Sequence, residues 1–363
     1  MGIAGIPSMM TAAQVVQLNK PHELNQVETF HELRSHDLLI KTVAASLCHT
    51  DLMIIDGTLP ASLPMTASHE GAGIVIATGD AVNNIKVGER VMSGLPLNLC
   101  GQCEDCLGPE DRVQYCKHTE GSIGLGMDGA FADYHVADSR TTSLIPDTVN
   151  FAEAAALACA GRTVYRAIKI CGLGVGDYLA IIGAGGGLGH LGVQFAQAKG
   201  FKVIAIDARD ASLELCKEIG ADHVLDARDG QHRIIVEVQK ITGTSGANAT
   251  LNLSAHPTAT QMACAVTKDH GTMIQVAGPE KTTISIFDLV FRDINIKGTM
   301  LAGSKCSAEM LEEYAKHGLK VQMETFHGLR QVPEMVLALH SGALKGKAVC
   351  VVDADRYAED IAQ

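Results

Sequence analysis

Four cysteines lie within seventeen residues of this chain, at Cys100, Cys103, Cys106 and Cys116. A C-x2-C-x2-C triplet with a fourth cysteine beyond it can close a tetrahedral shell of four thiolates around a metal ion. Such a shell leaves no open position, so it would brace a loop instead of carrying out chemistry. A redox-active C-x2-C pair is the alternative, but the triplet lacks the thioredoxin-like βαβ context. We therefore predict a structural metal site.

A second set of metal-binding residue types is scattered along the chain. It consists of Cys48 in CHTD, His69 and Glu70 in HEGAG, and Cys159 in CAGRTVY. Two thiolates and one imidazole suit zinc and leave a fourth position for water or substrate, as a catalytic metal requires. A lone cysteine or histidine is, however, more often a core residue than a ligand. Spacing rules alone cannot join residues this far apart.

A glycine-rich turn joins an apolar strand to an amphipathic helix further along the chain. Glycines let the backbone turn tightly and approach a pyrophosphate, which then faces the positive end of the helix dipole. Asp207 ends the next strand and can bind both ribose hydroxyls while repelling a 2′-phosphate, so NAD is preferred over NADP. Arg209 could still attract a 2′-phosphate. The turn runs from Gly183 to Gly189, and its candidate cofactor contacts are Gly183, Gly185, Gly186, Gly187 and Leu188.

The elements that must position these residues change in character along the chain. Up to about residue 159, short β-type runs such as GAGIVIATG are broken by glycine and proline, which indicates an irregular, mostly antiparallel β domain. From residue 176, apolar strands alternate with helices, which predicts a parallel, doubly wound sheet and hence an α/β protein. We expect domains at 1–159 and 160–300, and a segment at 301–363 that returns to the first domain.

The composition limits the class of protein. The 363 residues include 29 basic and 41 acidic side chains, a net charge of −12, with no basic cluster. Nucleic acid and anionic membranes are therefore poor candidate partners. No apolar run approaches the roughly 18 to 20 residues of a membrane span, and the first residues lack a secretory signal. We expect a cytoplasmic protein, in which clustered thiols hold metal more often than they form disulfides.

The order of these motifs resembles that of zinc-dependent alcohol dehydrogenases of the medium-chain dehydrogenase/reductase superfamily, in particular the yeast-type enzymes. CHTD, HEGAG, the four-cysteine lobe at about 98–118, CAGRTVY and a Rossmann unit follow in the same order over nearly the whole chain. The resemblance implies a GroES-like, mostly β catalytic domain and a Rossmann cofactor domain. It also implies one catalytic and one structural Zn²⁺ per chain, NAD, and a homotetramer or homodimer built through the cofactor domains.

The resemblance implies a catalytic metal site made of the scattered residues. Cys48, His69 and Cys159 match the ligands of the catalytic zinc. Glu70 matches the neighbouring carboxylate that can replace water on the metal, and Asp51 the residue that orients the imidazole of His69. Metal analysis should therefore find close to two zinc ions per chain.

The resemblance also implies the reaction. Thr50 matches the hydroxyl that accepts the proton of the bound alcohol, whose hydride passes to the nicotinamide. The reaction is reversible, and it converts a primary or secondary alcohol to an aldehyde or ketone. The cofactor would contact His49 and Lys347 at the pyrophosphate, where Lys347 replaces an arginine of the family, and Val276 and Leu301 at the nicotinamide.

One departure from the family concerns the proton. The histidine that usually relays it to solvent is Met53 here, and a thioether cannot carry a proton. Asp56 or His49 could take this part, or the proton could leave through water. The sequence does not distinguish these routes.

Further departures concern the substrate and the ribose. Leu59 and Leu95 stand where the yeast-type enzymes narrow their pocket with tryptophans, and this chain has no tryptophan. We therefore expect an apolar pocket for a substrate larger than ethanol. Ser212 replaces a lysine that contacts the ribose, which weakens the preference for NAD.

Two other functions compete with this one. A zinc-independent quinone or enoyl reductase of the same superfamily would lack the Cys/His ligands and the four-cysteine lobe, whereas all seven ligand positions are filled here. A catalytically degenerate binding protein would fit the missing relay histidine, but not the intact ligands and dinucleotide motif. Titration with NADH separates an enzyme from the degenerate binding protein, because an inert scaffold need not change the nicotinamide fluorescence.

Overall fold

The computed structural model describes residues 5–30, 32–108, 111–342 and 344–362, which form two compact units. Unit 1 comprises Met1–Cys159, Ala302–Ala315 and Met323–Gln363, and unit 2 comprises Ala160–Leu301 and Lys316–Gln322. The chain first passes from unit 1 to unit 2 inside a π-helical segment, Leu157–Gly161, which contains Cys159. No helix in the described part of the chain is long and apolar enough to cross a membrane.

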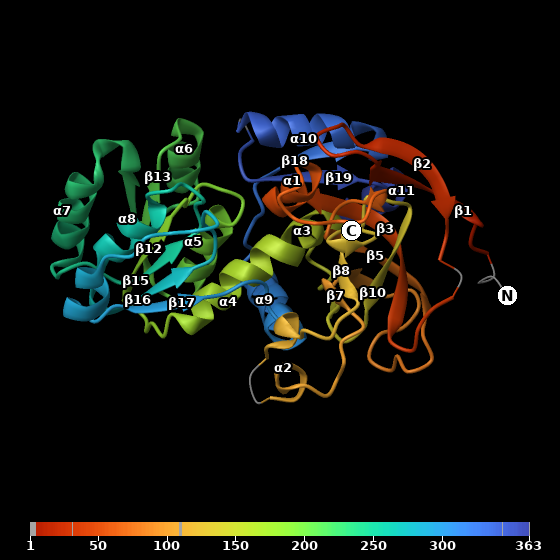
Figure 1. Cartoon of the computed structure of the whole chain (residues 1–363), viewed down its shortest axis with the longest axis horizontal. Coiled ribbons are helices and arrows are strands. Elements are labelled where there is room, and N and C mark those ends of the chain that lie inside the picture. The colour runs from red at the N-terminus through yellow and green to blue at the C-terminus, as the bar shows by residue number, and fades with distance from the viewer. Residues whose placement is uncertain (1–4, 31, 109–110, 343, 363) are drawn as a thin grey trace. The chain divides into compact units, whose positions relative to one another are not determined.

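Unit 1 is built mainly from β-strands (Figure 1). Its axis is β3 (Asp37–Leu47), which pairs antiparallel with β5 (Glu70–Thr78), β10 (Tyr134–Asp138) and β19 (Lys347–Val351). Its other strands are β1 (Met9–Val15), β2 (Glu23–Glu28), β4 (Met65–Thr66), β6 (Arg90–Met92), β7 (Pro96–Leu97), β8 (Gly121–Ile123), β9 (Gly126–Met127), β11 (Ser143–Leu144) and β18 (Met323–His327). They complete a seven-stranded sheet around β3 and two three-stranded sheets, ordered β2-β1-β4 and β7-β8-β9.

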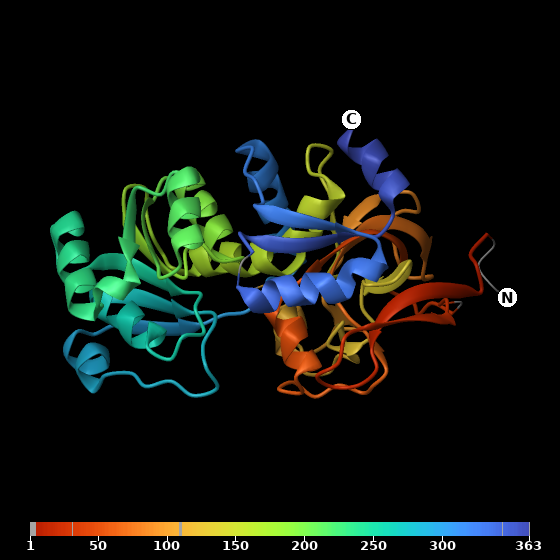
Figure 2. The ribbon, with the colours of Figure 1, turned by 90° about the horizontal axis from the view of Figure 1, so that it is seen from above.

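The sequence of β3 explains its central place. DLLIKTVAASL is apolar on both faces, and all of its residues except Lys41 are buried, as in a strand that is covered on both sides. The C-terminal part of the chain completes the core, since α10 (Val332–Ser341) packs on β18 and β19 (Figure 2). The helices of unit 1 are α1 (His49–Ile55), α2 (Glu104–Leu107), α3 (Phe151–Ala156), α9 (Ser304–Lys316), α10 (Val332–Ser341) and α11 (Ala354–Ile361).

Unit 2 contains the predicted parallel sheet, which confirms the expected fold class. Its strands are β12 (Tyr178–Ile182), β13 (Lys202–Asp207), β14 (His223–Asp226), β15 (Ala247–Asn252), β16 (Thr267–Gln275) and β17 (Asn295–Gly298). All neighbours pair parallel, in the order β14-β13-β12-β15-β16-β17. The helices of unit 2 are α4 (Arg162–Ile170), which precedes β12, and α5 (Gly189–Ala198), α6 (Asp210–Glu218), α7 (Gln231–Thr242) and α8 (Ala259–Val266), which follow strands of the sheet.

Both faces of this sheet are covered. Alternate residues of β12 and β13 pack against α7 and α8, namely Ala180, Ile182, Ile204 and Ile206. Because successive side chains point to opposite faces of a strand, the residues between them face the other side, where α5 and α6 contact β12, β13 and β14. The strand order reverses between β12 and β15. Parallel sheets bind nucleotides at the carboxyl ends of the strands that flank such a reversal.

Candidate active site

Four residues that are scattered in the sequence meet in unit 1. The ligand atoms of Cys48, His69, Glu70 and Cys159 all lie within 4.8 Å of one another. Cys48 follows β3, His69 and Glu70 lie at the start of β5, and Ser46 of β3 is paired with Glu70. Cys159 comes from the π-helical segment, a distortion that often occurs at functional sites. The arrangement could hold one metal ion.

The imidazole of His69 has a fixed orientation. Its Nδ1 forms a hydrogen bond of 2.9 Å with Asp51 Oδ1, and both side chains are buried. The other carboxylate oxygen of Asp51 accepts the backbone N–H of Cys48 at 2.8 Å. Burial alone would lower the pKa of His69, but the Asp51 carboxylate raises it well above its usual value. Nε2 is therefore left as a basic ligand atom, as at metal sites with a carboxylate–histidine pair.

The two thiols of this group affect each other's pKa in opposite directions. The Cys159 thiol hydrogen-bonds to Cys48 and lowers the pKa of Cys48 well below its usual value, in spite of burial. The same contact and burial raise the pKa of Cys159. A cation is needed before both can ionise in this buried place, and a thiolate–imidazole donor set suits Zn²⁺. Thr50 Oγ1 lies 3.8 Å from the sulfur of Cys48.

Glu70 is bound to Lys347. The Lys347 ammonium donates to Glu70 Oε1 at 2.8 Å, to Glu70 Oε2 at 2.6 Å and to the carbonyl of Leu47 at 3.0 Å. Burial raises the pKa of Glu70 to about 7, against the opposing effect of Lys347. Lys347, which we predicted at the cofactor pyrophosphate, thus directs all three N–H bonds of its ammonium to acceptors in unit 1. No sequence spacing indicates this pair, whose members are 277 positions apart.

The other predicted residues of unit 1 lie on α1, shortly after it at Leu59, and directly before β7 at Leu95. His49 is its exposed first residue, and Met53 is half-buried one turn later. Leu59 is also half-buried, whereas Leu95 is buried.

The four cysteines of the lobe form a second cluster. The sulfur–sulfur distances are 3.9 Å for Cys100 and Cys106, 3.6 Å for Cys103 and Cys106, 3.8 Å for Cys103 and Cys116, and 3.6 Å for Cys116 and Cys100. The longer spacing before Cys116 therefore does not keep its sulfur from the others. Hydrogen bonds from backbone N–H groups, chiefly that of Gln102, lower the pKa of Cys100 to about 6. Burial raises the pKa of Cys106 to about 12. Four sulfurs at such distances fit a closed tetrahedral site.

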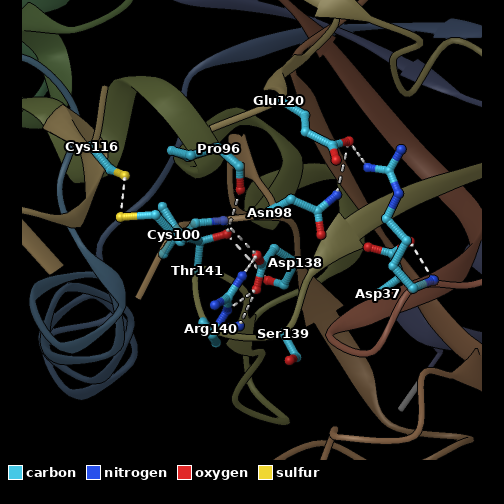
Figure 3. Close-up of polar contacts among 12 residues, drawn as sticks. Asp37, Pro96, Asn98, Cys100, Cys116, Glu120, Asp138, Ser139, Arg140 and Thr141 are labelled. Carbon is cyan, nitrogen blue, oxygen red and sulfur yellow. Dashed lines mark hydrogen bonds and ion pairs between the residues drawn. The ribbon is translucent and has the colours of Figure 1, made fainter. Parts of the chain in front are cut away.

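Contacts on two sides hold the lobe in place. Leu99, directly before the first cysteine, donates its N–H to Asp138 Oδ2 at 3.3 Å. Arg140 donates to the same carboxylate oxygen at 2.6 Å, and Figure 3 shows this pair together with Cys100 and Cys116. On the other side, Asp111 accepts the N–H of Cys306, in the first turn of α9, at 3.0 Å. These contacts favour a bracing role for the lobe.

The glycine-rich turn of unit 2 begins where β12 ends. Gly183 has a φ of +79°, which favours glycine. A side chain on Gly185 would meet the backbone of Ser212 at 2.3 Å, so the turn packs against α6. Asp207 Oδ2 accepts the N–H of Gly185 at 3.0 Å, and the Arg209 guanidinium lies 3.8 Å from Asp207 Oδ1. Gly186, Gly187 and Leu188 continue the turn to the start of α5.

The two residues expected at the nicotinamide belong to the same unit. Val276 directly follows β16, and its N–H bonds to the carbonyl of Asn252 at the end of β15, at 3.1 Å. Leu301 has a φ of +47°, and its N–H donates to Thr163 Oγ1 at 3.1 Å. Val276 therefore lies at the carboxyl edge of the sheet, near the end of β15.

Known alcohol dehydrogenases resemble this chain over most of its length. Family models described as alcohol dehydrogenase GroES-like domain and zinc-binding dehydrogenase match residues 34–147 and 187–316. An alcohol dehydrogenase of Schizosaccharomyces pombe is 35% identical over 317 residues, 86% of this chain and 89% of the relative.

Solved structures give the same result. The alcohol dehydrogenase of Aeropyrum pernix matches with a TM-score of 0.84 at 26% identity, over 94% of this chain and 99% of that one. An acetophenone reductase from Geotrichum candidum in complex with NAD matches with a TM-score of 0.83 at 26% identity, over 96% and 98% of the two chains. This chain therefore belongs to the zinc-dependent alcohol dehydrogenases of the medium-chain dehydrogenase/reductase superfamily.

Proposed function

We propose that this protein is a zinc-dependent alcohol dehydrogenase that transfers hydride reversibly between a primary or secondary alcohol and NAD, giving an aldehyde or ketone. The main support is the meeting of Cys48, His69 and Cys159 within 4.8 Å in unit 1. Relatives named alcohol dehydrogenase and an NAD-bound structural relative agree with this activity. In this proposal unit 1 is the catalytic domain and unit 2 the cofactor domain.

Cys48, His69 and Cys159 would hold the catalytic zinc. A zinc ion with three protein ligands acts as a Lewis acid that lowers the pKa of a bound alcohol. Asp51 keeps Nδ1 of His69 engaged, so that Nε2 stays available as a ligand. Thr50 Oγ1, close to the sulfur of Cys48, would accept the alcohol proton. Since Met53 cannot carry it further, the proton would leave through exposed His49, Asp56 or water.

The cofactor would bind at the carboxyl edge of the sheet in unit 2. The glycine turn would approach the pyrophosphate, Asp207 would accept the ribose hydroxyls, and Val276 and Leu301 would contact the nicotinamide. The carboxylate of Asp207 supports NAD, whereas the guanidinium of Arg209 beside it reduces the discrimination against NADP. His49 remains our proposed further contact to the pyrophosphate.

The substrate would be larger than ethanol. Leu59 and Leu95 offer apolar surface where the yeast-type enzymes carry tryptophans, and they leave more room. Apolar alcohols with longer chains or rings should therefore give a higher kcat/KM than ethanol, because they bury more apolar surface.

The four-cysteine lobe would hold a second, structural zinc. The closed set of sulfurs and the contacts of Asp138 and Asp111 on either side support this role. Metal analysis should find close to two zinc ions per chain. A single zinc would mean that the lobe is empty or oxidised.

The chain would form a homodimer or homotetramer through unit 2, in the cytoplasm. The exposed apolar side chains Ile286, Phe287, Leu289, Val290 and Phe291 support this assembly, as does β17, the edge strand of the parallel sheet. Exposed apolar patches of this kind mark association surfaces.

A substrate screen tests the proposed activity. NADH absorbance should rise with a panel of primary and secondary alcohols and NAD, and fall with the matching aldehydes or ketones and NADH. The same panel with NADP measures the cofactor preference. If none of the alcohols supports turnover while quinones or enoyl compounds do, the proposed reaction is wrong.

A further inference from the structure

The buried ion pair of Glu70 and Lys347 lies inside the proposed catalytic metal site. Glu70 is fully buried, and Lys347 is 5% exposed. Glu70 begins β5 and Lys347 begins β19, and both strands pair with the end of β3, where Ser46 faces Glu70 and Leu47 faces Ala348. The sheet therefore fixes the two side chains relative to each other.

We infer that Lys347 is a positioning residue, which holds the carboxylate of Glu70 away from the metal and so keeps the fourth coordination position open for substrate. This inference rests on the proposed function, in which Cys48, His69 and Cys159 bind zinc. It assigns Lys347 to the metal site in unit 1 instead of to the cofactor.

The need for such a residue follows from the ligand set. Glu70 offers a carboxylate oxygen within 4.8 Å of the ligand atoms of Cys48, His69 and Cys159. A zinc ion with four protein ligands is typical of structural sites, whereas three ligands and an open position are typical of catalytic ones. Glu70 is therefore the residue that could close this site.

The contacts of Lys347 oppose that closure. Its ammonium has three N–H bonds, and these point to Oε1 of Glu70, Oε2 of Glu70 and the carbonyl of Leu47. Both carboxylate oxygens are thus engaged at 2.8 and 2.6 Å by a cation other than the metal. A buried carboxylate without a cation is strongly destabilising, so Glu70 should turn to the metal when Lys347 is removed.

The test uses the protein loaded with Co²⁺, whose absorption reports its ligands, and imidazole as a probe of the open position. In Lys347→Met, the cobalt spectrum should differ from that of the wild type before imidazole is added. The affinity for imidazole should fall about ten-fold or more, because Glu70 occupies the position that imidazole needs.

Three further variants separate positioning from a structural role. Glu70→Gln/Lys347→Met, which also removes the buried negative charge, should regain the spectrum and imidazole affinity of the wild type. Lys347→Arg, which keeps the charge and can grip both carboxylate oxygens, should also resemble the wild type. If Lys347→Met does not fold, Lys347→Gln replaces it, with the same expected direction.

Three results would overturn the inference. One is a cobalt spectrum and imidazole affinity in Lys347→Met equal to those of the wild type. Another is a double variant that binds imidazole as weakly as Lys347→Met. The third is a Lys347→Met protein that loses NADH binding with an unchanged metal site, which would return Lys347 to the cofactor. Failure of the proposed function would give a different result. The wild type and Cys48→Ala would then show the same cobalt–thiolate absorption.

Discussion

At the scale of single residues, the proposed catalytic site depends on buried polar groups that already have partners. Asp51 holds both the imidazole of His69 and the backbone of Cys48, so one carboxylate sets the positions of two proposed ligands. The thiol of Cys159 in turn stabilises the thiolate of Cys48. These residues are therefore arranged to bind a cation. Substitutions of the proposed ligands should reveal this as a loss of bound metal.

Replacing Cys48 tests this arrangement. Cys48→Ala should lose one zinc per chain and at least about a hundred-fold in kcat/KM, because two protein ligands hold zinc poorly. Cys171→Ala is the matched control, since Cys171 is also a buried cysteine but lies outside both clusters. Metal analysis and steady-state kinetics provide the measurement. Full zinc content and activity in Cys48→Ala would refute the ligand assignment.

The buried imidazole of His135 should make the free energy of unfolding depend on pH. It is fully buried between Thr42 Oγ1 at 2.8 Å and Ser93 Oγ at 2.6 Å, and burial lowers its pKa to about 3. Since the unfolded chain binds a proton near pH 6.5, the contribution of this neutral histidine is complete above that pH and declines as the pH falls toward 3.

The His135→Gln variant isolates this contribution. The difference in unfolding free energy between wild type and variant should shrink by about 3 kcal/mol between pH 7 and pH 4, as measured by urea denaturation. A difference that stays constant across this range would show that His135 is not kept neutral by burial.

At the scale of elements, the cofactor turn depends on close backbone contacts. Gly185→Ala would place a methyl group 2.3 Å from the Ser212 carbonyl oxygen and should push the turn away from α6. We expect at least about a ten-fold loss of NADH affinity, because the backbone must approach the pyrophosphate closely.

Gly174→Ala is the control for that variant. Its methyl group would meet only Asp177 Oδ2, at 3.8 Å, in the turn that precedes β12. NADH affinity, measured by fluorescence titration, should stay near that of the wild type. Equal affinities for the two variants would mean that the turn does not hold the cofactor as proposed.

The elements of unit 2 could largely be predicted, because strong periodic patterns specify them. β12, α5 and β13 lie where the apolar runs and glycines place them. The boundary between α8 and β16 is the exception, since α8 ends at Val266 and β16 begins at the next residue, Thr267. The hydroxyl of Thr267 bonds to the carbonyl of Ala263 at 2.7 Å, which ends the helix, and Thr267 pairs with Ala247. Such tertiary pairing leaves no local signal.

At the scale of the whole molecule, association should depend on the exposed apolar segment of unit 2. The rings of Phe287 and Phe291 stack at 5.5 Å and are 59% and 74% exposed. Phe287→Ser/Phe291→Ser should shift the protein to a smaller species in sedimentation velocity, because it removes the apolar contact. Val236→Ser, on exposed α7 surface of the same unit, should not. If both variants sediment as the wild type, the interface lies elsewhere.

The sites illustrate what the sequence can and cannot predict. The spacing of the four lobe cysteines is local, so it predicts their cluster directly. Cys48, His69 and Cys159 span more than a hundred positions, and only the resemblance to a family joins them. The contact of Glu70 with Lys347 arises because β5 and β19 both pair with β3, a consequence of topology that neither segment encodes alone.

The most direct test of the account is whether alcohol oxidation depends on the metal held by Cys48, His69 and Cys159. NADH formation from NAD and the best alcohol of the screen should be measured before zinc is removed, after its removal and after its return. The rate should be lost with the metal and restored by Zn²⁺ in the wild type, but not in Cys159→Ala. An undiminished rate in the metal-free protein, or full restoration in Cys159→Ala, would contradict it.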